Sequence, residues 1–93
     1  MFTSSTNPFE QEELETITVS ECVVMLYNDD VNTFEWVIEC LVKYCGHDTL
    51  QAEQCAWFVH TKGRYPVKHG ELEKLMPVCS ALCDKGLAAK LEQ

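Results

Sequence analysis

The fold is decided by the stretch Cys22-Val23-Val24-Met25-Leu26-Tyr27, which runs directly into Asn28-Asp29-Asp30. Six apolar residues in a row, two of them β-branched, are typical of a central strand that is buried on both faces. The three polar residues that follow favour a turn, because their short side chains hydrogen-bond to nearby backbone. We therefore predict a central strand that ends at Tyr27, followed by a polar turn.

A first helix is predicted after this turn, over about Thr33 to Cys45, because apolar residues recur there at helical spacing. Asn32 followed by Glu35 is the pattern of an N-cap with its reciprocal carboxylate at the third position. Gly46 is suited to ending the helix, because glycine accepts the left-handed conformation that is common after a last turn.

A second helix is predicted over about Thr49 to Lys62. Asp48 and Gln51 form the same kind of cap, and Gly63 ends the pattern. Its apolar stripe consists of Ala52, Cys55, Ala56 and Val59, and it is widened by Trp57 and Phe58.

The rest of the chain predicts an edge strand or extended linker over 64–68, since Pro66 cannot donate to a sheet ladder. A third helix should start near Lys74, which would leave Pro77 in its first turn. A final strand is expected over Leu87 to Leu91. The fold class is therefore α+β: a small three-stranded antiparallel sheet with three helices packed on one face.

Length and composition limit the function. A chain of 93 residues has room for one domain, which we expect over 21–93, after a flexible acidic N-terminal extension over 1–20. The net charge of −8 disfavours nucleic acid and anionic membrane surfaces as partners. No signal peptide or membrane-spanning run is recognised, so we expect a cytoplasmic protein.

The six cysteines lie inside apolar stretches and are expected to be reduced core thiols. A zinc site is the alternative, but there is no C-x-x-C pair. The i,i+4 pair Cys79 and Cys83 has no second pair at metal-binding spacing. We therefore predict neither a metal site nor a cofactor.

The polar turn after the strand is the first candidate for function. An ordinary turn with caps would explain it, yet the adjacent carboxylates of Asp29 and Asp30 repel each other and are not required for a turn. They would suit a bound cation. The acidic bias agrees, since Met1 to Val42 holds nine acidic residues and no lysine or arginine.

Three segments together resemble the ClpS family of adaptors for the bacterial Clp ATP-dependent protease. These are the strand ending in Asn28-Asp29-Asp30, the helix opening Phe34-Glu35-Trp36-Val37-Ile38, and Ala52-Glu53-Gln54 through Val59-His60 to Gly63. The resemblance covers about Val23 to Leu91. It implies a non-enzymatic adaptor that captures proteins whose first residue is Leu, Phe, Tyr or Trp and delivers them to a ClpA- or ClpC-type AAA+ unfoldase.

The resemblance also implies site residues, by position in the family's motifs. Asn28, Asp30 and His60 match residues that bind the substrate's α-amino group, and their acceptor atoms suit an ammonium with three donors. The walls of the side-chain pocket match Leu26, Phe34, Val37, Ala56 and Val59. Many members have Thr-Pro-Met where this chain has Asn32-Thr33-Phe34, and a larger residue at Ala56, which predicts a pocket of different shape.

Two other function classes are alternatives to the adaptor. A small metal-dependent or cysteine-dependent enzyme using Asp29, Asp30, His60 and a thiol would need a metal or nucleophile motif, and the sequence contains no H-x-x-x-H, C-x-x-C or glycine-rich phosphate loop. A general docking module of the same fold would not need the three acceptors. The adaptor is the favoured hypothesis.

Overall fold

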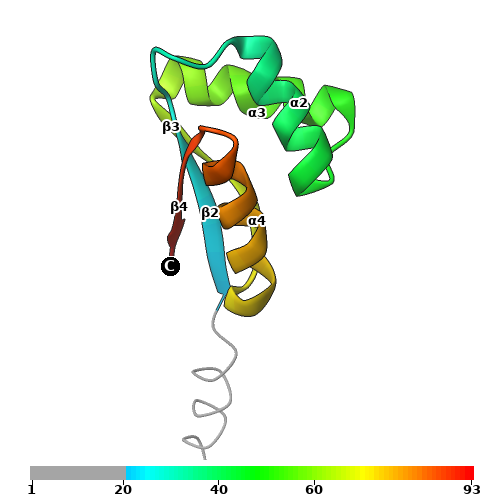
Figure 1. The fold of residues 1–93 in the computed structure, drawn as a ribbon, viewed down its shortest axis with the longest axis vertical. Helices are drawn as coiled ribbons and strands as arrows, with labels where there is room; N and C mark the ends of the chain where they lie inside the picture. Colours follow the sequence, from blue (N-terminus) through cyan, green and yellow to red (C-terminus); the bar gives the residue numbers. More distant parts are fainter. Residues whose placement is uncertain (1–20) are drawn as a thin grey trace, which may run out of the picture.

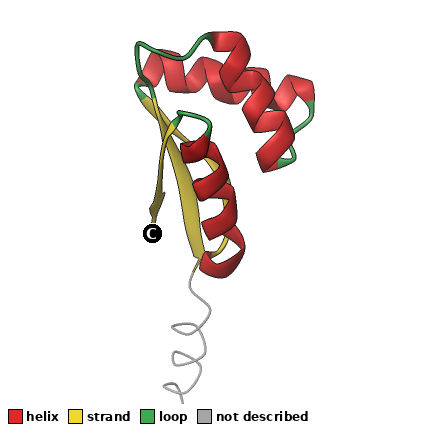
Figure 2. Cartoon of the chain, viewed as in Figure 1, coloured by secondary structure: helices red, strands yellow, loops and turns green. Residues whose placement is uncertain are grey.

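The computed structural model describes residues 21–93, so the extension expected over 1–20 lies outside the described residues. Figures 1 and 2 show a strand, two helices, a strand, a helix and a final strand. In chain order the elements are β2 (Glu21–Tyr27), α2 (Phe34–Cys45), α3 (Thr49–Lys62), β3 (Arg64–Glu71), α4 (Leu72–Asp84) and β4 (Ala88–Glu92). The predicted order of elements is confirmed.

The sheet has three strands in the order β3-β2-β4, and both outer strands run antiparallel to β2. β3 carries one extra residue where its register with β2 shifts between Val24 and Met25. Pro66 pairs with Met25 at this irregularity and is tolerated because β3 is an edge strand. Arg64 thus begins an edge strand, as predicted, but the strand extends to Glu71.

The helices cover one face of the sheet. Cys22, Val24 and Leu26 of β2 are buried, whereas the alternate residues along the strand are half-buried. Figure 1 shows α4 running alongside β2, while α2 and α3 lie together at one end of the sheet, where α3 contacts β3. The predicted class, three helices with a three-stranded antiparallel sheet, is confirmed. Only one face of β2 is fully buried, because the described residues supply no second helical layer.

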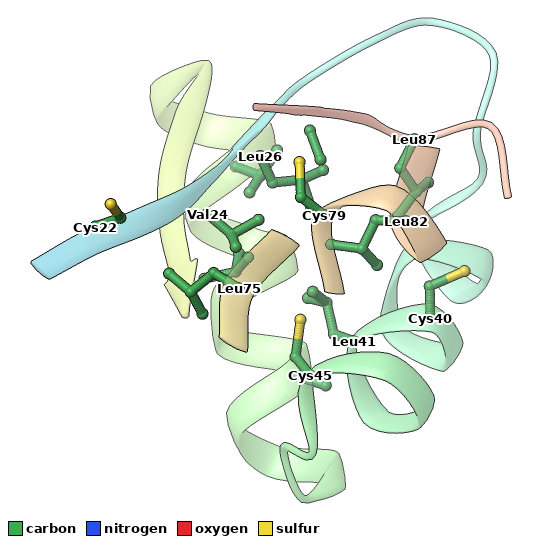
Figure 3. Packing of buried hydrophobic residues seen from close by; sticks show 14 residues of the cluster. Cys22, Val24, Leu26, Cys40, Leu41, Cys45, Leu75, Cys79, Leu82 and Leu87 are labelled. Atoms are coloured by element: carbon green, nitrogen blue, oxygen red, sulfur yellow. The ribbon is translucent and has the colours of Figure 1, made fainter. Parts of the chain in front are cut away.

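The core lies between this face and the helices. Figure 3 shows Leu75 and Leu82 of α4 in one cluster with Val24 of β2 and Leu41 of α2, and the three leucine side chains are fully buried. Of the six free thiols, those of Cys22, Cys40, Cys45 and Cys79 are buried among these apolar side chains. Burial raises the pKa of the Cys45 thiol to about 11, so it is protonated at neutral pH.

The starts of two helices also differ from the sequence predictions. The N-cap of α2 is Thr33, whose Oγ1 accepts from the Trp36 backbone N–H at 3.1 Å, and not Asn32. The two neighbours are both good capping residues, so the sequence alone does not choose between them. α4 starts at Leu72, which puts Pro77 in its second turn. Pro77 lies on the exposed side of α4, where water can satisfy the carbonyl that loses its backbone donor.

Candidate functional site

The site lies where the end of β2 meets the end of α3. The backbone N–H of Asn28 donates to the carbonyl oxygen of Gly63 at 2.9 Å. Gly63 is in the left-handed conformation, with φ 90°, and its own N–H donates to the Val59 carbonyl. This conformation lets the chain turn sharply from α3 into β3. The result is that the first residue of the polar turn lies beside the last turn of α3, which carries His60.

The polar turn is organised by one carboxylate. Asp29 Oδ1 accepts from the backbone N–H groups of Val31 and Asn32 at 2.9 and 2.8 Å, and Oδ2 accepts from Asn32 Nδ2 at 2.9 Å. The hydrogen bond from the Asn32 backbone has the largest effect and lowers the pKa of Asp29, and the other two donors lower it further. Burial acts in the opposite direction, but the pKa remains below its ordinary value. Asp29 is therefore ionised at neutral pH and held in one orientation.

Two hydrogen bonds attach this turn and α2 to the connection between α4 and β4. Asn32 Nδ2 also donates to the Gly86 carbonyl at 2.9 Å, and Trp36 Nε1 donates to the Lys85 carbonyl at 3.1 Å. Gly86 has φ 89°, which a side chain would strain. The polar turn and the start of α2 are thus fixed to a part of the chain that lies 54 and 49 residues later in the sequence, respectively.

A cavity of ≈ 420 Å³ opens between the polar turn, α2 and α3. This volume is in the range of about 300–1,000 Å³ that is typical of small-ligand sites. Its polar lining comes from the turn and from the end of α3, whereas its apolar lining comes from facing positions of the two helices. The lining residues are Asn28, Asp29, Asn32, Phe34, Val37, Ala56, Trp57, Val59 and His60.

The cavity brings together six of the eight residues predicted for the site. Asn28 and His60 line its polar part, and Phe34, Val37, Ala56 and Val59 line its apolar part.

The other two predicted residues do not line the cavity. Leu26 is 1% exposed and belongs to the hydrophobic core. Asp30 is exposed beside the cavity, and its neighbour Asp29 lines the wall instead. Which of the two carboxylates faces the cavity depends on the turn conformation that Asn32 imposes on Asp29.

Besides Asp29, two residues of the lining are absent from the predicted site. The sequence pattern predicts Asn32 as a helix cap, but its side chain holds Asp29. The pattern also predicts that Trp57 widens the apolar stripe of α3, yet its side chain is 56% exposed and its ring centroid lies 6.3 Å from that of His60. Helical spacing contains the signal for Trp57, since it lies three residues before His60 and therefore shares its side of the helix.

Residues 21–93 contain no group of three or more His, Cys, Asp or Glu side chains that could hold a metal ion. No helix among these residues is long and apolar enough to cross a membrane. An ionised carboxylate, an amide oxygen and an imidazole nitrogen next to an apolar wall can accept hydrogen bonds from a cation that carries an apolar group.

Comparison with known proteins identifies the family of this chain. The family model of the ATP-dependent Clp protease adaptor protein ClpS matches residues 18–90. The chain belongs to the ClpS family, whose members are adaptors and not enzymes. Among curated proteins, none matches the chain in sequence.

A similar solved structure is that of Agrobacterium tumefaciens ClpS2 bound to L-phenylalaninamide. The two chains are 22% identical, with a TM-score of 0.74, and the match covers 77% of this chain and 94% of the other. At this identity the likeness shows that the two chains share a fold.

Proposed function

We propose that this protein binds the free N-terminus of proteins that begin with Leu, Phe, Tyr or Trp and delivers them to a Clp AAA+ unfoldase. The observation that carries the proposal is the composition of the cavity wall. Acceptors at Asn28, Asp29 and His60 adjoin an apolar surface of Val37, Ala56 and Val59, among others. An N-terminal residue of this kind combines an ammonium with a large apolar side chain on neighbouring atoms.

The acceptors have capacity for a ligand. Within residues 21–93, Val31 and Asn32 donate to the Asp29 carboxylate, and no donor is hydrogen-bonded to the side chains of Asn28 or His60. Asp29 Oδ2 accepts only one of these bonds. Asp30 is exposed beside the same turn and adds negative charge. An ammonium that enters here would meet an ionised carboxylate, an amide oxygen and an imidazole ring.

Magnitudes support a requirement for both halves of the ligand. Burying one Leu or Phe side chain contributes about 1.5–3 kcal/mol, whereas micromolar binding needs about 8 kcal/mol. Hydrogen bonds to a charged group contribute about 1.5–3 kcal/mol each, so two or three of them supply most of the difference before ordering costs. L-Phenylalaninamide, the ligand of the similar ClpS2 structure, carries both a free α-amine and an apolar side chain.

A general docking module of the same fold is the alternative function. It would recognise an internal segment of a partner and would have no need for a free amine. The two hypotheses therefore differ in a single chemical group on the ligand.

The deciding experiment compares a Leu-initiated peptide with the same peptide acetylated at its N-terminus. Acetylation removes the charge and all but one of the donors, while the side chain is unchanged. We expect affinity to fall by more than about a hundredfold, which corresponds to the loss of two charge-assisted hydrogen bonds or about 3 kcal/mol. Equal affinity for the two peptides would contradict the proposal and favour the docking module.

Variants assign the roles. Asn28→Ala, Asp30→Ala and His60→Ala should each weaken binding of the free-amine peptide. They should have little effect on the acetylated peptide, because it no longer carries the ammonium that these side chains would contact. Asp29→Ala belongs in the series because Asp29 lines the cavity. Weakening of the acetylated peptide by the same factor would show that a variant disturbs the pocket and not the ammonium contact.

Delivery is the second half of the proposed function. The partner would be a ClpA- or ClpC-type unfoldase in the cytoplasm of a bacterium, and the extension over 1–20 would act in the handover. Deleting residues 1–16 should leave peptide affinity unchanged and reduce degradation of a Leu-initiated substrate by the assembled protease. Undiminished degradation would contradict the role of the extension.

A further inference from the structure

A second hollow lies next to the cavity, on the outer side of α3. It is lined by Leu50, Glu53, Gln54, Trp57 and Phe58, which we call the α3 groove. Leu50 is 63% exposed and Trp57 is 56% exposed, although both are large apolar side chains. Exposed apolar surface of this kind next to a hollow marks a binding surface more often than a lone exposed leucine does.

Trp57 lines both hollows, so the α3 groove and the cavity are continuous across its side chain. Glu53, Trp57 and His60 follow one another at helical spacing, and all three are exposed. Glu53 lines the α3 groove, His60 lines the cavity, and Trp57 between them lines both. A chain that leaves the cavity beside His60 therefore meets Trp57 within the length of one or two residues, at about 3.3 Å per extended residue.

We propose that the α3 groove is a second subsite for the bound N-terminus, and that it takes a large apolar side chain at the second or third residue. The inference rests on the proposed function, because the first residue must be held in the cavity. Stacking on the exposed indole ring and covering Leu50 would bury apolar surface on both partners. Trp57 is then a specificity-determining residue for the substrate's following residues.

A charged side chain would fit the α3 groove less well than an uncharged apolar one. Glu53 and Gln54 are its polar members, while Lys62 lies 5.8 Å from the centre of the Phe58 ring. A cation at the groove would meet Glu53 but also Lys62, and an anion would meet Glu53. An uncharged apolar side chain gains from the indole ring and Leu50 without either conflict.

The test uses the full chain and three Leu-initiated peptides of otherwise identical sequence. One has Ser at positions 2 and 3, the second has Phe at position 2 only, and the third has Phe at position 3 only. We expect one of the Phe peptides to bind about tenfold more tightly than the Ser peptide, a difference of about 1.4 kcal/mol. Isothermal titration calorimetry measures each affinity and the folded fraction that binds.

Variants locate the source of this preference. Trp57→Ala and Leu50→Ala should each reduce the tenfold ratio to below about threefold, because each removes part of the groove. Both side chains are largely exposed, so the core is undisturbed. Met76→Ala is the matched control, since Met76 is 52% exposed on α4, and it should keep the full ratio.

The outcomes separate this inference from the proposed function. If acetylation abolishes binding but the Phe and Ser peptides bind alike, the α3 groove is not a subsite and the N-terminal recognition stands. If Trp57→Ala weakens all three peptides by one factor, Trp57 belongs only to the first-residue pocket and the inference is wrong. A preference that persists in both variants assigns the contact elsewhere and also overturns it. Absence of binding by every Leu-initiated peptide overturns both proposals.

Discussion

Asn32 Nδ2 donates to the carbonyl oxygen of Gly86 at 2.9 Å and, from the same nitrogen, to Asp29 Oδ2 at 2.9 Å. One amide group thereby connects the carboxylate that lines the cavity to the connection between α4 and β4. In this arrangement Asn32 is a positioning residue, because it orients a side chain of the cavity wall through hydrogen bonds to the rest of the fold.

Replacing Asn32 by Ala should weaken the Leu-initiated peptide by about fivefold, because Asp29 loses a donor worth about 1 kcal/mol and gains freedom to reorient. Fluorescence anisotropy with a labelled peptide measures the change. Thr33→Ala is the matched control, since it removes the N-cap of α2 and costs about 1 kcal/mol of stability without touching Asp29. If Thr33→Ala weakens the peptide as much, the effect of Asn32 is a general loss of stability.

Stability should fall on acidification through Asp29. Its pKa in the folded protein lies below the ordinary value of 3.8, so the unfolded chain takes up a proton first as the pH falls. The stability that Asp29 contributes is present above the ordinary value and is lost as the pH falls through the lower, folded value. Urea unfolding between about pH 6 and pH 3 measures how the free energy of unfolding changes with pH. This dependence on pH should be weaker in Asp29→Asn than in the parent protein. An unchanged slope in that variant would assign the acid sensitivity to other carboxylates.

Ala56→Trp should occlude the cavity. Ala56 is 2% exposed and its small side chain leaves room between α2 and α3, so an indole there would fill the space meant for the first residue. Binding of Leu and Phe peptides should become more than about tenfold weaker. Overpacking costs about 1–3 kcal/mol, so thermal unfolding followed by circular dichroism is measured in parallel.

Val37→Ala, which enlarges the same wall, provides a second variant if Ala56→Trp does not fold. It should weaken the Leu peptide more than the Trp peptide, because a larger side chain fills part of the added space. A folded Ala56→Trp protein that binds as tightly as the parent would contradict the assignment of Ala56 to the wall.

The thiols should differ in reactivity. Cys83 is exposed, whereas Cys45 is buried and its pKa is raised to about 11, so at pH 8 only about one Cys45 in a thousand is a thiolate. Iodoacetamide should therefore label Cys83 first and Cys45 only after denaturation, as followed by mass spectrometry. Labelling of Cys83 should leave peptide affinity unchanged, because Cys83 does not line the cavity. Rapid labelling of Cys45 in the folded protein would show that the α2 end opens readily.

Local sequence determined the elements whose signals lie within a few neighbouring residues. The run from Cys22 to Tyr27 is a strand because its β-branched and apolar side chains suit a buried, extended backbone. Asp48, Gln51 and Gly63 set the ends of α3 at the predicted residues, since capping bonds form between residues close in sequence. The family resemblance added six of the nine residues that line the cavity.

Tertiary structure decided the features that depend on distant partners. Asn32 and Thr33 cap helices about equally well, and the Gly86 carbonyl engages Asn32 and leaves Thr33 as the cap. The same Asn32 amide also donates to Asp29, which lines the cavity, whereas Asp30 is exposed. The sequence does not distinguish these two carboxylates, because they are neighbours in one polar turn. The sequence shows that Asn32 carries a hydrogen-bond donor, but only the folded structure shows that this donor is bound to Gly86, 54 residues later in the chain.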